Sequence, residues 1–196
     1  MTKHEEKAQL RRRMRTIAEG LSASYRTTAD QAITAHLIAM PEYQTAGTVC
    51  CFVGFGLEID TAPILKDALR TGKTLCVPFC EAEPGIFTLR QITDLQQLTP
   101  GSYHIPEPPA DAPVISTDQV DFTMIPCVTC DHFGHRLGRG GGYYDRFLSA
   151  YRGGMVLLCR EKLIREEIPV EPLDMPIPWV LTENGLYEDG TPARLG

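Results

Sequence analysis

A run of ten residues near position 140 constrains this chain more than any other feature. It reads Arg-Leu-Gly-Arg-Gly-Gly-Gly-Tyr-Tyr-Asp over residues 136–145, with four glycines in five positions. Glycine lacks a Cβ atom, so such a backbone bends freely and approaches a ligand closely. Arg136 and Arg139 add fixed positive charge, and Asp145 follows as an acid. We therefore expect a loop that brings backbone amides and cationic side chains to one place.

The residues after the glycines have helical periodicity. An apolar stripe at i, i+3, i+4 and i+7 is formed by Tyr144, Phe147, Leu148 and Tyr151. The loop should therefore lead into a helix N-terminus, whose free N–H groups and positive dipole end suit a phosphate. Arginines add bidentate contacts to phosphate oxygens, and a carboxylate suits Mg2+. The pattern predicts a site for nucleotide phosphates and magnesium.

This loop matches neither of two familiar phosphate-binding motifs. Gly-Lys-Ser/Thr does not follow the glycines, so the stretch is not a P-loop, and Tyr143 stands where Gly-x-Gly-x-x-Gly requires its last glycine. On spacing alone, a flexible surface loop before an ordinary helix is the alternative, because charged glycine-rich turns are common.

Length and composition indicate one globular domain over residues 1–196. Hydrophobic residues at 43% and charged residues at 22% are ordinary for such a domain. The net charge of −6 argues against a broad nucleic-acid surface. The polar start lacks a signal-peptide core, and apolar runs stay well below the roughly 20 residues of a membrane span. We expect a cytoplasmic protein in which most of the seven cysteines are reduced.

Helical and strand patterns alternate along the chain. Ser22 is placed to cap a helix that extends to about Met40. Short apolar runs predict about six strands, among them residues 47–53, 74–79, 87–90, 120–128 and 154–159. This order predicts an α/β fold with a mainly parallel sheet between helical layers, in which ligands bind at the carboxyl ends of strands.

The N-terminal segment carries a basic row. Lys7, Arg11 and Arg15 are spaced i, i+4 and i+8, so they share one face of a predicted helix. On composition alone, a solvated helix face is the favoured interpretation of this row.

Two cysteines at Cys127-x-x-Cys130 are followed by His132 and His135, which together offer four possible zinc ligands. Zinc modules normally separate their ligand pairs by a dozen or more residues. We therefore favour two thiols at the end of a buried strand over a metal or redox site.

The stretch Arg-Leu-Gly-Arg-Gly-x-Gly-Tyr-Tyr-Asp resembles the signature of the 5-formyltetrahydrofolate cyclo-ligase (methenyltetrahydrofolate synthetase) family. Lys7-Ala-Gln-Leu-Arg11 is similar to the family's N-terminal element, and Glu58 with Thr61 matches another. The segment 105–108, Ile-Pro-Glu-Pro, also resembles the family; it should line a substrate cleft or form a rigid connector. The resemblance covers nearly the whole chain and implies a single three-layer α/β/α domain.

Near the C-terminus, Asp174 matches a family acid. The positions where relatives usually carry a later acidic pair are Pro178 and Trp179 here. This departure argues against further acids from that segment in the site, and Trp179 is expected to pack.

The resemblance implies the reaction of 5-formyltetrahydrofolate with ATP to give 5,10-methenyltetrahydrofolate, ADP and phosphate, through phosphorylation of the formyl oxygen, with Mg2+ as cofactor. It also implies a role for each matching residue. The expected catalytic residues are Lys7, Arg136 and Arg139. The expected ATP contacts are Lys7, Arg11, Arg136, Leu137, Gly138, Arg139, Gly140, Gly141, Gly142, Tyr143 and Tyr144. The expected folate contacts are Val53, Glu58, Arg139 and Tyr143, and the expected magnesium ligands are Asp145 and Asp174.

Two other classes of function stay open. One is a different enzyme with a phosphate-bearing ligand on a similar layered fold, and the other is a catalytically silent folate- or nucleotide-binding protein. The separate basic row at Lys7 and Arg11 argues against the first, and the unbroken central motif argues against the second. In each case we expect a monomer without nucleic-acid or membrane partners. The expected folate can carry a polyglutamate chain.

Overall fold

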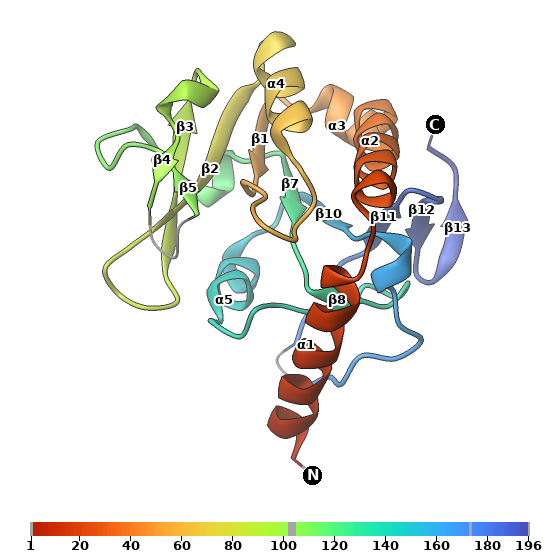
Figure 1. The fold of residues 1–196 in the computed structure, drawn as a ribbon. Coiled ribbons are helices and arrows are strands. Elements are labelled where there is room, and N and C mark those ends of the chain that lie inside the picture. Colours follow the sequence, from red (N-terminus) through yellow and green to blue (C-terminus); the bar gives the residue numbers. More distant parts are fainter. Residues whose placement is uncertain (1, 102–104, 173, 196) are drawn as a thin grey trace.

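A computed structural model describes residues 2–101, 105–172 and 174–195 of the chain. Within these residues, strands from residue 48 to residue 193 join one nine-stranded sheet, in the order β13-β12-β11-β10-β7-β1-β2-β3-β6 (Figure 1). Its strands are β1 (Thr48–Cys51), β2 (Thr74–Cys80), β3 (Phe87–Ile92), β6 (Val114–Ile115), β7 (Phe122–Ile125), β10 (Gly154–Leu158), β11 (Trp179–Thr182), β12 (Gly185–Glu188) and β13 (Thr191–Ala193). Two small ladders pair β4 (Thr99–Pro100) with β5 (Pro106–Glu107) and β8 (Thr129–Cys130) with β9 (Arg136–Leu137).

The five central strands run parallel, and the strands at both edges are antiparallel additions. Parallel pairs join β2 to β1, β1 to β7, β7 to β10 and β10 to β11. The hairpin of β12 and β13 extends one edge, and β3 with β6 extends the other. The predicted α/β class with its parallel sheet is confirmed, whereas the estimate of about six strands was low because the edge strands are short.

Helices cover both faces of the sheet, which gives three layers. They are α1 (Lys3–Glu19), α2 (Ala23–Ala39), α3 (Pro41–Thr45), α4 (Ala62–Arg70) and α5 (Tyr143–Ala150). Side chains along β1 alternate between two hydrophobic cores, one on each face of the sheet. Val49 and Cys51 pack with α2, α3 and α4, while Cys50 packs with α1 and α5. The alternation of buried strand residues thus places α1 beside α5, the two helices nearest the glycine-rich loop.

The helix ends follow the sequence signals. Thr2 and Glu5 form a capping box at the start of α1, and the Ser22 hydroxyl accepts a hydrogen bond from the Tyr25 amide at the start of α2. Proline at the first position of α3 separates that helix from α2, since Met40 between them has extended backbone angles. The predicted N-terminal helix and the Ser22 cap are confirmed.

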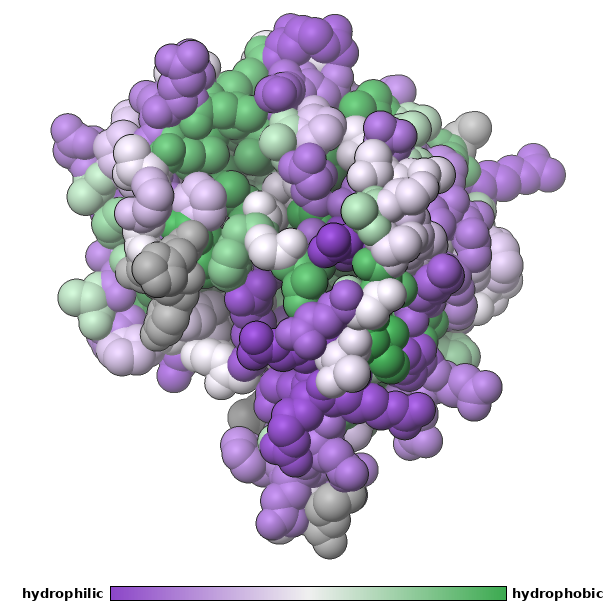
Figure 2. Space-filling model, in the orientation of Figure 1, coloured by the Kyte–Doolittle hydropathy of each residue, from purple (hydrophilic) through white to green (hydrophobic). Residues whose placement is uncertain are grey.

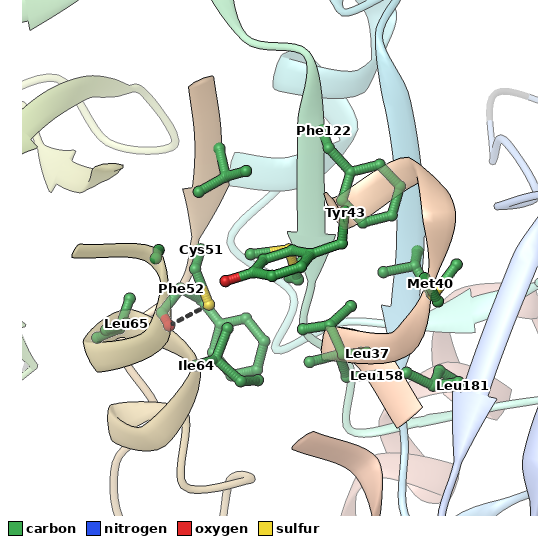
Figure 3. Close-up of a cluster of buried hydrophobic side chains, with 14 of the residues drawn as sticks. Leu37, Met40, Tyr43, Cys51, Phe52, Ile64, Leu65, Phe122, Leu158 and Leu181 are labelled. Carbon is green, nitrogen blue, oxygen red and sulfur yellow. Dashed lines mark hydrogen bonds between the residues drawn. The ribbon is translucent and has the colours of Figure 1, made fainter. Parts of the chain in front are cut away.

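Tyr43 anchors the core on the α2–α4 face. Its ring lies among the apolar side chains of α2, α4 and the central strands (Figure 3), and it is 1% exposed. Its hydroxyl donates to the Asp67 carboxylate over 2.9 Å, so the buried polar tip is satisfied. This packing fixes α4 and therefore the loop between β1 and α4.

Candidate functional site

A cavity of about 540 Å³ opens at the carboxyl-terminal edge of the parallel strands. The loops that follow β1 and β7 supply much of its wall, including Val53, Glu58 and Cys127. The glycine-rich loop, residues 138–142, closes another side. This volume and placement are typical of ligand sites in open α/β sheets. A cavity therefore lies at the sheet edge where the sequence predicts a ligand site.

The glycine-rich loop leads into α5 as predicted. Gly140 and Gly142 adopt φ angles of 96° and 72°, a region that residues with a Cβ atom rarely occupy. Gly142 precedes α5 without a side-chain cap, and the first intrahelical bond in this turn runs from the Arg146 amide to the Gly142 carbonyl. The helix N-terminus, with Tyr143 and Tyr144, lines the cavity. This arrangement gives the cavity an end suited to an anion.

Arg139 and Glu58, which come from different loops, meet at the cavity wall. Arg139 Nε and Nη2 lie 3.0 and 2.9 Å from Glu58 Oε1, and the guanidinium stacks 4.3 Å from the centroid of the Phe55 ring. The other carboxylate oxygen of Glu58 accepts a hydrogen bond from the Phe55 amide. Burial raises the pKa of the Glu58 carboxyl above its usual value, although the Arg139 charge opposes that rise.

The Arg136 side chain, which is 7% exposed, pairs with the first turn of α5. Its Nη2 lies 2.5 Å from Asp145 Oδ1, and its guanidinium lies 5.8 Å from the centre of the Tyr144 ring. Among the residues that the structure describes, the buried Tyr144 hydroxyl has no hydrogen-bond partner, and desolvation raises the pKa of this phenol well above its usual value. A buried hydroxyl of this kind costs about 1–3 kcal/mol until a ligand satisfies it.

Two residues of the predicted basic row on α1 contact different partners: Arg11 contacts the glycine-rich loop, and Lys7 contacts two acidic side chains. Arg11 Nε donates to the Gly138 carbonyl over 2.8 Å, so α1 supports the glycine-rich loop directly. Lys7 is buried, and its Nζ lies 2.6 Å from both Glu171 and Asp174. Burial acts to lower the pKa of the Lys7 ammonium, but the hydrogen bonds to Asp174 and Glu171 outweigh it and raise the pKa. The exposed face of α1 is hydrophilic (Figure 2).

The structure brings ten of the predicted site residues to the cavity wall. They are Val53, Glu58, Arg136, Gly138, Arg139, Gly140, Gly141, Gly142, Tyr143 and Tyr144. Five others lie outside that wall: Lys7, Arg11, Leu137, Asp145 and Asp174. Leu137 is 1% exposed, and its carbonyl accepts a hydrogen bond from the Val128 amide, so its side chain is part of the core. All fifteen assignments of role stay predictions.

Some cavity residues were not assigned a role from the sequence. Glu107 is buried at the wall and accepts a hydrogen bond from the Cys80 amide. Phe87 lies parallel to Tyr143, with ring centroids 6.4 Å apart, and forms an aromatic side of the cavity. The signal for Glu107 was the segment Ile-Pro-Glu-Pro, whose residues 105–107 do line the cavity. The sequence offered no comparable signal for Phe87, because β3 reached the site through its antiparallel pairing with β2.

Glu58 is held in place by a buried ion pair that the sequence did not reveal. Arg160 is 2% exposed, and its Nε and Nη2 donate to the two carboxylate oxygens of Asp30 over 2.7 and 2.8 Å. The same guanidinium donates to the carbonyls of Leu57 and Glu58, both over 2.9 Å. Asp30 also accepts a hydrogen bond from the Asp60 amide, so the pair fixes the loop backbone on both sides of Glu58.

The chemistry of Asp145 and Asp174 suits Mg2+, which prefers carboxylate oxygens and retains several waters. Asp145 is more than half exposed and Asp174 about a quarter exposed, so both carboxylates are open to water. Each is paired with a predicted phosphate-binding cation, Arg136 and Lys7 respectively. The chemistry of each carboxylate therefore suits the ion once a ligand displaces its paired cation.

Together these features define an α/β protein with an anion-suited glycine-rich loop and an aromatic, acid-lined wall in one cavity. A sequence profile of the 5-formyltetrahydrofolate cyclo-ligase family matches residues 3–183. The chain belongs to this family and is therefore an enzyme of the ligase class. In the described residues, none of the helices is long and apolar enough to cross a membrane.

Named relatives and solved structures agree with this assignment. The chain is 31% identical to the mitochondrial 5-formyltetrahydrofolate cyclo-ligase of Arabidopsis thaliana, covering 92% of this chain and 75% of the relative. It is 30% identical to the Escherichia coli K12 cyclo-ligase, covering 81% and 90% respectively. The structure of Aquifex aeolicus 5,10-methenyltetrahydrofolate synthetase aligns with a TM-score of 0.82 and 26% identity, over 97% of this chain and 96% of that one.

Proposed function

We propose that this protein converts 5-formyltetrahydrofolate to 5,10-methenyltetrahydrofolate with consumption of ATP. One observation supports this most directly: the glycine-rich loop and the acid–aromatic wall belong to a single cavity, and Arg139 joins them by its pairing with Glu58. The loop suits a phosphate group, and the acid–aromatic wall offers hydrogen-bond acceptors and rings to a flat heterocycle. Family membership supports the same reaction.

The proposed chemistry has two steps. The formyl oxygen attacks the γ-phosphorus of ATP, the bond to the bridging oxygen breaks, and ADP leaves. N10 of the folate then attacks the formyl carbon, its proton passes to solvent, and the C–O bond breaks with release of phosphate. Phosphoryl transfer of this kind depends on positioning and charge neutralisation more than on a covalent nucleophile.

The residues of the cavity wall fit these demands. The amides of residues 138–142 and the N-terminus of α5 hold phosphate oxygens. Arg136 and Arg139, with Lys7 from α1, neutralise charge that develops on the transferred group. Arg11 keeps the loop in place through the Gly138 carbonyl and contacts ATP.

Glu58, Val53 and Tyr143, which line the same cavity, hold the folate. The Glu58 carboxylate accepts N–H donors of the pterin ring, Val53 packs against it, and Tyr143 stacks on or hydrogen-bonds to it. A carboxylate is a suitable partner here because it carries acceptor oxygens only and so selects the donor edge of a heterocycle.

Asp145 and Asp174 are the residues proposed to hold Mg2+. When bound, the ion neutralises phosphate charge and orients the transferred group.

The test measures turnover of 5-formyltetrahydrofolate in the presence of Mg2+, with and without ATP. The near-ultraviolet absorbance of the conjugated methenyl product reports the reaction. An ATP-dependent rise supports the proposal. A rise without ATP identifies a different reaction, and ligand binding without any rise identifies the silent-binder alternative. Arg139→Ala should abolish most of the rise, with Arg12→Ala, an exposed arginine on α1, as the matched control.

A further inference from the structure

Three cysteines from separate segments meet behind the cavity wall. Cys127 follows β7, Cys130 ends β8 and Cys159 follows β10. Because β7 and β10 are neighbouring parallel strands, the residues beyond their carboxyl ends lie side by side. The three sulfur atoms all lie within 4.8 Å of one another. Within residues 2–101, 105–172 and 174–195, no other three potential metal ligands come this close together.

The sulfur spacing is close to that of a zinc centre. A Zn–S bond of about 2.3 Å places sulfurs roughly 3.8–4.0 Å apart in a tetrahedral or trigonal arrangement. The observed separations therefore require a movement of at most about 1 Å, which side-chain rotation of cysteine supplies. All-sulfur donor sets of this kind select Zn2+ and other soft cations over Mg2+.

A small hollow of about 20 Å³ lies beside two of the three cysteines. Cys127 and Cys159 both line it, and Arg160 and Glu58 form part of its wall. A space of this size accommodates one water molecule, which is the fourth ligand that a three-cysteine site needs. Cys127 also lines the main cavity, so that cavity provides an entry path for the ion.

The two nearby histidines serve other purposes. His132 Nε2 lies 3.1 Å from Glu161, and its ring stacks on Tyr187 with centroids 3.9 Å apart. His135 Nδ1 lies 2.8 Å from Asp131. The pairing of Cys127 and Cys130 with these histidines, considered from the sequence, is thus replaced by a pairing with Cys159 that only the fold creates.

We propose that Cys127, Cys130 and Cys159 bind one Zn2+ ion, with a water in the adjoining hollow as the fourth ligand. Three S–H bonds are exchanged for three Zn–S bonds, and the three protons pass to solvent. The centre carries one net negative charge, and the Arg136 guanidinium, which also pairs with Asp145, lines the cavity that Cys127 shares.

The test uses the full-length protein, stripped with a chelator and kept in a thiol-free reductant. Co2+ is added first, because a cobalt ion bound by thiolates shows intense charge-transfer absorption, and Zn2+ should then displace it. Elemental analysis after dialysis should find one zinc per chain. The absence of charge-transfer absorption in the unmodified protein overturns the proposal without recourse to any variant.

Variants then locate the ion. Cys130→Ser and Cys159→Ser should each weaken zinc binding by more than about tenfold, since even outer-sphere changes cost 10- to 100-fold. Cys76→Ser, a fully buried cysteine in β2 outside the group, is the matched control and should retain full binding. Equal zinc binding in all three variants places the ion elsewhere and overturns the proposal.

Discussion

The buried pair of Arg160 and Asp30 gives the sharpest test of how the fold positions Glu58. In Arg160→Met, the apolar stem remains but four donated hydrogen bonds are lost, two to Asp30 and one each to the carbonyls of Leu57 and Glu58. Among the described residues, the Asp30 carboxylate then stays buried, at 8% exposure, with the Asp60 amide as its remaining hydrogen-bond donor. The variant therefore leaves a charge without its counter-ion.

Removal of one member of a buried ion pair typically costs about 3–5 kcal/mol. The low exposure of both partners places this pair in that range. For a chain of this length, 1 kcal/mol corresponds to about 2–4 °C in Tm, so Arg160→Met should unfold about 6–20 °C earlier. Arg12→Met, on an exposed site, should stay within about 0.5 kcal/mol of the parent.

Equilibrium urea unfolding and folate binding separate the two consequences. The free energy of unfolding should fall by the stated amount at an unchanged m value, and the double variant Arg160→Met/Asp30→Leu should recover much of it, because an apolar pair of similar volume tolerates burial. Affinity for 5-formyltetrahydrofolate should stay low in the double variant, since the carbonyls of Leu57 and Glu58 lack their donor. A loss below about 1 kcal/mol in Arg160→Met would refute the reasoning.

Three further outcomes follow from the site. Arg11→Ala should reduce turnover at least tenfold, while Arg12→Ala leaves it unchanged; equal turnover would remove Arg11 from the loop's support. Gly142→Ala should cost about 1–2 kcal/mol of stability because its φ angle is positive, and an unchanged urea midpoint would contradict this. Arg139→Ala removes the charge that opposes the raised pKa of Glu58, so folate binding should weaken at a higher pH than in the parent as acid is added. An acid limb at the same pH in both proteins would show that Glu58 does not control binding.

The sign of that last shift follows from the carboxylate's role. Burial raises the pKa of Glu58 in the folded protein, so its charged form is disfavoured there and its contribution to stability diminishes as the pH rises through that pKa. Folate binding has the opposite pH dependence, because it needs the charged Glu58 carboxylate as acceptor. Folate affinity is therefore lost as the pH falls through the raised pKa of Glu58. Stability and affinity should therefore respond to Glu58 with opposite slopes in the same acid range.

The features that the sequence predicted well are local ones. The glycines at 140 and 142 impose backbone angles on their own neighbourhood, and the stripe from Tyr144 to Tyr151 has the period of the helix that follows. Both patterns are complete within some fifteen residues of the printed sequence. The Ser22 cap belongs to the same category, because a cap bonds only to amides two or three residues away.

The features that escaped prediction depend on partners far apart in the chain. Asp30 and Arg160 are separated by 130 residues, and each alone is typical of an exposed helix or loop residue. Cys159 joins Cys127 and Cys130 only because β10 lies next to β7. The short edge strand β6 was similarly hidden, since a two-residue pairing leaves no periodicity for a sequence pattern to reveal.

The charges around the phosphate-suited end are mutually compensated, which has a thermodynamic consequence. Lys7 pairs with Asp174 and Arg136 with Asp145, so two of the predicted phosphate ligands are each joined to a predicted magnesium ligand. If ATP binds alone, its phosphates take Lys7 and Arg136 and leave the Asp145 and Asp174 carboxylates close to negative charge. If Mg2+ binds alone, it takes the two carboxylates from Lys7 and Arg136. Each ligand therefore removes part of the cost of the other, and by linkage the gain in ATP affinity from Mg2+ must equal the gain in Mg2+ affinity from ATP.

This coupling can be measured by calorimetric titration of a non-hydrolysable ATP analogue with and without Mg2+. Asp145→Asn should reduce the magnesium-dependent gain in affinity, because the variant keeps a side chain of the same shape but offers a weaker ligand and a weaker partner for Arg136. Glu19→Gln, at an exposed position on α1, is a control that preserves the gain. If Asp145→Asn retains the full gain, Asp145 stays paired with Arg136 throughout, and the carboxylate has a structural role at the start of α5 in place of a metal-binding one.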